Sequence, residues 1–162
     1  MRTQGFLIAG LVLLLDQATK AIIAERFTTS TAISVIPGFF RLVLVENTGM
    51  AFGILDDANS PLAFWALTLV STAVLIFVAY LLWTNQSPSA LGHYGLAVIL
   101  GGAAGNVIDR LARGMVIDFL DFYVGTHHWP AFNVADAAIV VGAALLIIDH
   151  VRGGRPQSIA RA

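Results

Sequence analysis

The stretch from Leu62 to Trp83 contains no charged residue and follows Ser60-Pro61, a favourable start for a helix. About 20 apolar residues in an α-helix cross the hydrocarbon core of a bilayer. The stretch therefore predicts a transmembrane helix, and it restricts the chain to the folds that a membrane allows.

Three further apolar stretches have similar lengths, at about residues 6–24, 91–108 and 134–151. Hydrophobic residues make up 57% of the 162 residues and charged residues only 12%, roughly half of the ~25% usual in soluble domains. We expect an all-α membrane protein, a four-transmembrane-helix bundle forming one domain over residues 1–162. The tail 152–162 contains Gly, Pro and Arg with little to bury and is predicted to be disordered.

The connection between the first two spans is more than a linker. Pro37-Gly38 predicts a turn, and the segments 39–45 and 50–55 are predicted to be short strands on either side of the turn Glu46-Asn47-Thr48-Gly49. We expect a small amphipathic β-hairpin lying at the membrane interface.

Several functions are excluded or disfavoured by composition. The net charge is −1 and the nine Lys and Arg residues are dispersed, so no basic stripe for nucleic acid is present. The chain has no cysteine, and its four histidines lack the HExxH spacing, so we expect no metal and no cofactor. No small-x-small cleavage site follows the first apolar run, which favours a retained span over a removed signal peptide.

Polar residues within the spans gather on one side of the membrane, because consecutive spans cross in opposite directions. The late ends of the first and third spans and the early end of the fourth share that side, as do both long polar connections. Ionisable residues in apolar spans are candidates for function by default. The residues brought to this side include Asp16, Lys20, Asn47, Asn106, Asp109, Arg110, Asp118, Asn133 and Asp136. The positive-inside rule does not orient the chain, since basic residues are nearly balanced between the two sides.

Asp118 and Asp136 are candidates for a catalytic pair of the aspartic-protease kind. Two carboxylates close together in a poorly hydrated site share a proton, so one can take a proton from water while the other donates one to the substrate. The alternative is that Asp136 only stabilises a helix N-terminus and Asp118 is solvated. Spacing also does not choose between Asp118 and Asp121.

The remaining polar residues admit structural and functional roles. Asp16 and Lys20 stand four residues apart and are predicted to form an ion pair within one helix, as are Asp109 and Arg113. Arg110 lies off that face and is available for a substrate carbonyl, a lipid phosphate or Asp16. The asparagines at 47, 106 and 133 suit either an extended substrate backbone or contacts between helices.

Five short strings together resemble the signal peptidase II (lipoprotein signal peptidase) family, and they occur in family order across residues 16–136. They are Asp16-Gln17-Ala18-Thr19-Lys20, Asn47-Thr48-Gly49-Met50-Ala51-Phe52, Gly105-Asn106-Val107-Ile108-Asp109-Arg110, Val116-Ile117-Asp118-Phe119 and Phe132-Asn133-Val134-Ala135-Asp136. No motif position departs from the family pattern.

The resemblance implies a metal-independent aspartyl endopeptidase of the bacterial inner membrane that cleaves prolipoproteins before a diacylglyceryl-modified cysteine. It implies that Asp118 and Asp136 are the catalytic pair. Substrate contact or support of the site would fall to Asp16, Lys20, Asn47, Asn106, Asp109, Arg110 and Asn133. Its implied partners are lipid-modified prolipoproteins and membrane lipids, with both termini cytoplasmic and the active site near the outer leaflet.

A small transporter or proton-relay subunit is the alternative function, since intramembrane carboxylates also carry protons. The clustering of acids on one side and their absence from 62–83 argue against a polar path across the membrane.

Overall fold

The computed structural model describes residues 2–48, 61–84 and 89–153. Four helices, α1 (Arg2–Arg26), α2 (Pro61–Trp83), α3 (Ala90–Arg113) and α4 (Val134–Gly153), are each long and apolar enough to cross a membrane. The predicted four-helix membrane class is confirmed. The helices extend past the predicted spans, and at its C-terminal end α3 continues from residue 108 to residue 113, so that its last turn carries Arg110 and Arg113. Basic residues there are favourable because a helix C-terminus carries partial negative charge.

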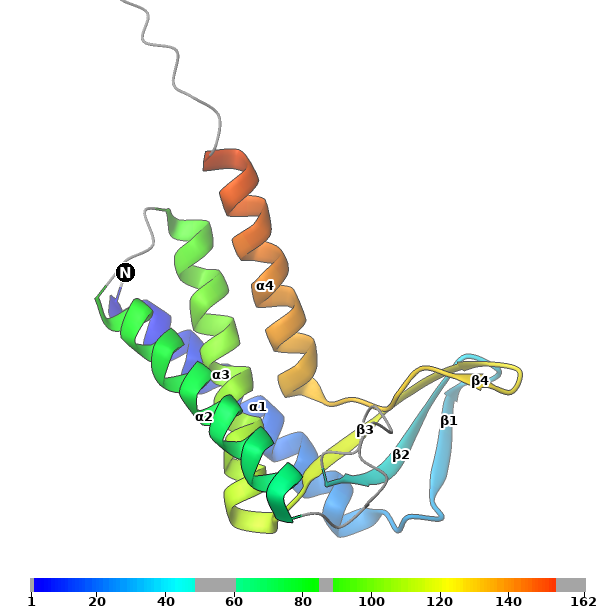
Figure 1. Ribbon diagram of the computed structural model, residues 1–162. Helices are drawn as coiled ribbons and strands as arrows, with labels where there is room; N and C mark the ends of the chain where they lie inside the picture. The colour runs from blue at the N-terminus through cyan, green and yellow to red at the C-terminus, as the bar shows by residue number, and fades with distance from the viewer. Residues whose placement is uncertain (1, 49–60, 85–88, 154–162) are drawn as a thin grey trace, which may run out of the picture.

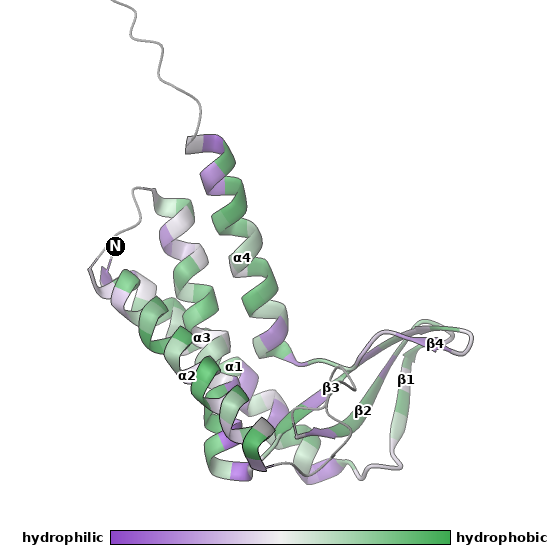
Figure 2. Cartoon of the chain, in the orientation of Figure 1, coloured by the Kyte–Doolittle hydropathy of each residue, from purple (hydrophilic) through white to green (hydrophobic). Residues whose placement is uncertain are grey.

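α3 is the central helix of the bundle, as Figure 1 shows. It packs against α1, α2 and α4, and most of its apolar residues are buried, whereas the other three helices leave theirs exposed on the outside. Figure 2 shows that α2 and α4 consist mostly of hydrophobic residues, and many of these are exposed, such as Leu69, Phe77 and Val140. A surface of this kind matches lipid, in which outward apolar side chains carry no cost.

Glycines on α3 allow close packing against its neighbouring helices. A Cβ at Gly101 would lie 2.5 Å from the carbonyl oxygen of Ala9 in α1, and one at Gly102 would lie 2.4 Å from that of Ala135 in α4. Real Cβ contacts are not that short, so only glycine fits at these two positions. Neighbouring residues of α3 thus hold α1 on one face and α4 on another.

A four-stranded antiparallel sheet projects from one end of the bundle (Figure 1). Its strands, in spatial order, are β1 (Ala32–Ile36), β2 (Phe40–Asn47), β3 (Val116–Val124) and β4 (His127–His128). The sheet is larger than the predicted hairpin, because the connection between α3 and α4 supplies β3 and β4. β2 contains most of the predicted strand 39–45 but continues through Glu46 and Asn47, which were predicted to lie in a turn and instead pair with β3. The predicted strand 50–55 lies outside the described residues.

Two apolar clusters stabilise the fold, one within the helix bundle and one between the bundle and the sheet. One joins α1, α2 and α3 away from the sheet, around Leu82 and Ala97. The other joins the end of α1 to the sheet through Ile23, Leu44 and Phe119. The start of α1 and the end of α4 lie at the end of the bundle opposite the sheet (Figure 1). α4 includes residues 152 and 153 of the predicted disordered tail, and 154–162 lie outside the described residues.

Candidate active site

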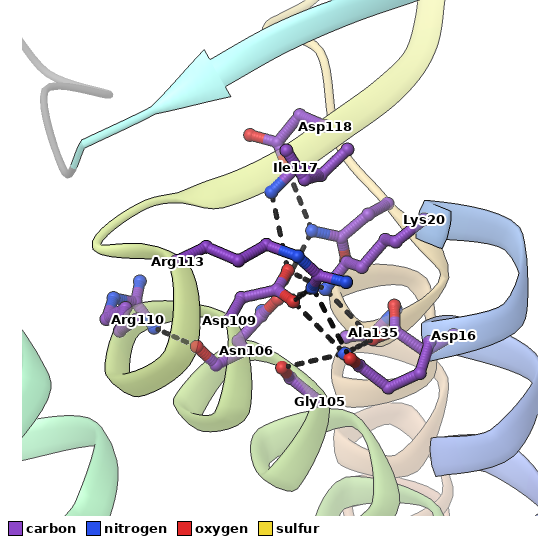
Figure 3. A network of polar contacts seen from close by, with 12 residues as sticks. Asp16, Lys20, Gly105, Asn106, Asp109, Arg110, Arg113, Ile117, Asp118 and Ala135 are labelled. Atoms are coloured by element: carbon purple, nitrogen blue, oxygen red, sulfur yellow. Dashed lines mark hydrogen bonds and ion pairs between the residues drawn. The ribbon is translucent and has the colours of Figure 1, made fainter. Parts of the chain in front are cut away.

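The polar residues expected on one side of the membrane meet where α1, α3, the start of α4 and the sheet converge. Asp16, Lys20, Asp109 and Asn133 are fully buried, Asp118 is 2% exposed and Asn106 is 7% exposed. A buried charge is costly unless it is paired and hydrogen-bonded. Every one of these side chains has such partners, as Figure 3 shows for the centre of the cluster.

Lys20 is the cation at the centre of this cluster. Its Nζ lies 2.9 Å from Asp16 Oδ2 and 2.9 Å from Asp109 Oδ2, and it donates to Asn106 Oδ1 at 2.9 Å. The predicted ion pair within α1 is present, but the ammonium also ties α1 to α3. Asp109 pairs with Arg113 as predicted, so two cations face two buried carboxylates.

Asp16 also fastens the start of α4. Its Oδ1 accepts the backbone N–H of Ala135 at 2.9 Å. The first N–H groups of a helix have no partner within the helix, so a carboxylate at that end satisfies one of them and interacts favourably with the positive end of the helix dipole. This bond sets the position of the first turn of α4, which carries Asp136.

The Asn106 amide can take only one orientation. Its Oδ1 accepts from Lys20 Nζ at 2.9 Å and from Asn133 Nδ2 at 3.2 Å, while its Nδ2 donates to Asp136 Oδ1 at 2.8 Å. An ammonium is only a donor and an ionised carboxylate only an acceptor. A flipped amide would therefore place donor against donor and acceptor against acceptor, so Lys20 keeps the Asn106 amino group directed at Asp136.

Asn133 joins the two candidate catalytic carboxylates. Its Nδ2 donates to Asp118 Oδ1 at 2.7 Å, and its backbone N–H donates to Asp136 Oδ2 at 3.2 Å. Its Oδ1 in turn accepts from the Asp136 N–H at 2.9 Å, a reciprocal cap at the start of α4. Asp118 and Asp136 are thus held around one asparagine, although 18 residues separate them in the sequence.

Burial raises the pKa of Asp118 to about 6. A hydrogen bond from Asn47 Nδ2 to Asp118 Oδ2, 2.9 Å long, lowers it, and the nearby negative charge of Asp136 raises it again. The alternative of a simply solvated Asp118 therefore does not hold. A carboxyl with a pKa near neutrality can both give and take a proton under ordinary conditions.

Asp121 belongs to a different group of side chains. It lies on β3 three residues from Asp118, and because side chains alternate along a strand the two point to opposite faces. Arg41 Nε donates to Asp121 Oδ2 at 2.6 Å, and His128 Nδ1 lies 3.0 Å from Asp121 Oδ1. Burial raises the pKa of Asp121, but these hydrogen bonds lower it on balance.

Arg110 faces a cavity between α2, α3 and α4. The cavity has a volume of about 280 Å³, and Asn106, Arg110 and Asp136 line it together with apolar residues. Within the described part of the chain, the Arg110 guanidinium makes one long hydrogen bond, 3.4 Å from Nη1 to the Asn106 carbonyl oxygen. Among the described residues, no Cα atom of α2 lies within 8 Å of one in α4, and the cavity lies between these two helices.

Sequence reasoning missed two features. Gln17 Nε2 lies 3.2 Å from Asp16 Oδ2, from the Gly105 carbonyl oxygen and from Asp109 Oδ1, so this neutral residue helps join α1 to α3. Its presence in the string Asp16-Gln17-Ala18-Thr19-Lys20 was the available signal. The group Arg41–Asp121–His128 joins three strands, and no local spacing predicts it because it depends on strand pairing.

Four apolar helices around buried carboxylates and amides define a polytopic membrane protein with a candidate acid–base site. The family model described as signal peptidase (SPase) II matches residues 8–152. The chain belongs to this family, and it is a multi-pass bacterial membrane protein.

Similarity to known proteins extends over nearly the whole chain and supports this membership. The chain is 45% identical over 155 residues to the lipoprotein signal peptidase of Solibacter usitatus, covering 96% of this chain and 94% of the relative. It is 51% identical over 142 residues to that of Cupriavidus taiwanensis, covering 88% and 79%. A solved structure described as a bacterial membrane enzyme has a TM-score of 0.82 and 29% identity, covering 99% of this chain and 94% of the other.

Proposed function

We propose that the chain removes signal peptides from lipid-modified prolipoproteins, cleaving before the diacylglyceryl-modified cysteine, with Asp118 and Asp136 as an aspartic catalytic pair. Family membership supports the reaction. The single observation that carries the proposed pair is that Asn133 hydrogen-bonds both carboxylates, one through its side chain and one through its backbone.

In the proposed reaction the two carboxyl groups hold a water molecule between them. Asp136, ionised, takes a proton as the water oxygen bonds to the scissile carbonyl carbon. Asp118, protonated, gives its proton to the carbonyl oxygen, which forms a tetrahedral intermediate with two hydroxyl groups. As the C–N bond breaks, Asp136 gives the leaving amine the proton that it took from water, and Asp118 takes a proton back from one hydroxyl, so both carboxyl groups return to their starting states. The raised pKa of Asp118 supports its role as the acid.

The buried ion cluster would serve this chemistry by positioning. Lys20 directs the Asn106 amino group at Asp136, and Asp16 holds the first turn of α4. Donors fixed in advance stabilise charge without reorganising during the reaction. Arg110 lines the cavity beside Asp136, and Asn47 donates a hydrogen bond to Asp118, so both would contact the substrate near the scissile bond.

The proposed mechanism uses no metal ion. Among residues 2–48, 61–84 and 89–153, no three His, Asp or Glu side chains gather closely enough to hold one. The acid–base chemistry above requires only carboxyl groups and water.

We further propose that both termini are cytoplasmic and that the site lies near the outer leaflet. The chain has no cysteine, so single cysteines report topology without background. Ser30→Cys lies beside the sheet and Thr3→Cys at the opposite end, both at exposed positions. A membrane-impermeant maleimide added to intact spheroplasts should label Ser30→Cys alone. Labelling of Thr3→Cys alone would show that the protein has the opposite orientation in the membrane.

The deciding experiment compares one precursor peptide with and without its diacylglyceryl group. The purified protein should cleave only the lipidated form, and Asp118→Asn and Asp136→Asn should each abolish cleavage. Asp121→Asn is the matched control, a carboxylate on the same strand that should retain turnover. Substantial turnover by either of the first two variants would remove that residue from the pair. Absence of cleavage by the wild-type protein would refute the function itself.

A further inference from the structure

The middle of α2 carries three hydroxyl side chains in an otherwise apolar span, Thr68, Ser71 and Thr72. Thr68 Oγ1 donates to the Phe64 carbonyl oxygen at 2.8 Å, and Thr72 Oγ1 donates to the Thr68 carbonyl oxygen at 2.7 Å. Both hydroxyls are thus satisfied within the helix, the usual solution for such groups in lipid. Ser71 differs from them, because among the described residues its hydroxyl has no hydrogen bond.

Ser71 lines the cavity of about 280 Å³ that also contains Asn106, Arg110 and Asp136. The other residues of this lining are apolar: Val70, Val74, Ala103 and Ile139. The Ser71 hydroxyl is therefore the polar group that α2 contributes to a space whose remaining polar groups come from α3 and α4. Ser71 is half-buried, and its hydroxyl has no partner among the described residues, so a ligand that supplies an acceptor there would gain affinity.

We propose that the Ser71 hydroxyl donates a hydrogen bond to a carbonyl oxygen of the lipid-modified substrate. This inference rests on the proposed function. The acceptor is a carbonyl because the charges of Arg110 and Asp136 already balance in this cavity, and because a lipidated precursor carries neutral ester and peptide carbonyls. Arg110, on the facing helix, offers further donors to the same space.

Ser71→Ala tests this by removing only the hydroxyl. Thr72→Val is the matched control, since it removes a neighbouring hydroxyl that is already satisfied within the helix. We expect Ser71→Ala to raise KM roughly three- to tenfold with kcat nearly unchanged, as for the loss of one hydrogen bond made equally in the bound and transition states. Thr72→Val should leave KM unchanged.

Two lipidated precursors of the same peptide identify the acceptor. One carries ester-linked acyl chains and the other ether-linked alkyl chains of equal length. If Ser71 binds an ester carbonyl, Ser71→Ala raises KM for the ester substrate alone, and the wild-type protein already has the higher KM for the ether. If Ser71 binds a peptide carbonyl, KM rises equally for both substrates. Either result supports the proposal.

An unchanged KM for both substrates would overturn it. So would a fall in kcat and thermal stability at unchanged KM, because that pattern assigns Ser71 to helix packing. Failure of the proposed function is distinguishable, since it appears as an inactive wild-type protein or as retained turnover in Asp118→Asn.

Discussion

Asp118→Asn should abolish cleavage and at the same time stabilise the protein above neutral pH. The ionised Asp118 is buried, with a pKa of about 6 in the folded protein against an ordinary value of 3.8. The folded state therefore binds this proton more tightly than the unfolded state. Its contribution to stability is fully present below pH 3.8 and is lost as pH rises to about 6, after which it stays lost.

The size of the effect follows from the two pKa values. At 1.36 kcal/mol per pKa unit, ionisation of Asp118 costs about 3 kcal/mol of unfolding free energy. An asparagine at 118 avoids this cost but faces amide donors from both Asn133 and Asn47, so it loses one hydrogen bond worth about 1 kcal/mol. We expect a net stabilisation of about 1–2 kcal/mol at pH 8.

The assay is thermal unfolding of wild-type and variant protein in detergent between pH 4 and pH 8, followed by tryptophan fluorescence. Between pH 4 and pH 8 the cost of ionising Asp118 changes by about 2–3 kcal/mol, so the difference in Tm between wild-type and variant protein should change by about 5–10 °C, at about 2–4 °C per kcal/mol for a chain of this size. Asp121→Asn is the control, because we expect the opposite change in stability at pH 8. Hydrogen bonds from His128 and Arg41 outweigh burial and lower the pKa of Asp121, so its removal should destabilise the protein at pH 8. A constant difference for Asp118→Asn, or a less stable variant at pH 8, would refute the reasoning.

Four further predictions concern the same site. Asn47→Ala removes a hydrogen bond that lowers the pKa of Asp118, so the alkaline limb of the kcat/KM profile should move to higher pH from its position near 6; an unmoved limb would argue against Asp118 as the acid. Lys20→Met leaves buried carboxylates uncompensated and should lower the unfolding free energy by about 3–5 kcal/mol; a loss below about 1 kcal/mol in chemical or thermal unfolding would contradict the central role of Lys20. Gly102→Ala places a Cβ against the α4 backbone and should destabilise by about 1–3 kcal/mol. A Cβ at Gly10 would have nothing within 4 Å, so the control variant Gly10→Ala should not be destabilised. Equal melting temperatures for the two variants would exclude close packing of α3 against α4. EDTA should leave cleavage unchanged, and activity lost in EDTA and restored by zinc would indicate a metallopeptidase.

Helix length and the side of the membrane on which polar residues lie were predictable because they depend on local sequence. An uncharged stretch such as 62–83 has few options in lipid, and alternation of spans assigns each helix end to a side. The Asp16–Lys20 pair was predictable for the same reason, since four residues in a helix bring two side chains together. The strands β3 and β4 were not predicted, because the run from 116 to 124 was interpreted only as part of a polar connection.

The choice between Asp118 and Asp121 shows where local reasoning ends. Both are acids on one strand with apolar neighbours, so spacing gives them equal standing. Strand register separates them: Val45 is opposite Asp118 and brings Asn47 within reach, whereas Arg41 is opposite Asp121. Only the resemblance to a family had favoured Asp118 beforehand.

By itself the sequence determined the class of fold, the four spans and the family, because composition and short strings are properties of neighbouring residues. Tertiary structure alone decided that Lys20 reaches Asp109 and Asn106 on α3, that Asn133 joins Asp118 to Asp136, and that Ser71 faces the cavity. These contacts depend on how helices rotate about their axes and how strands pair, and both are set by packing between segments far apart in the chain.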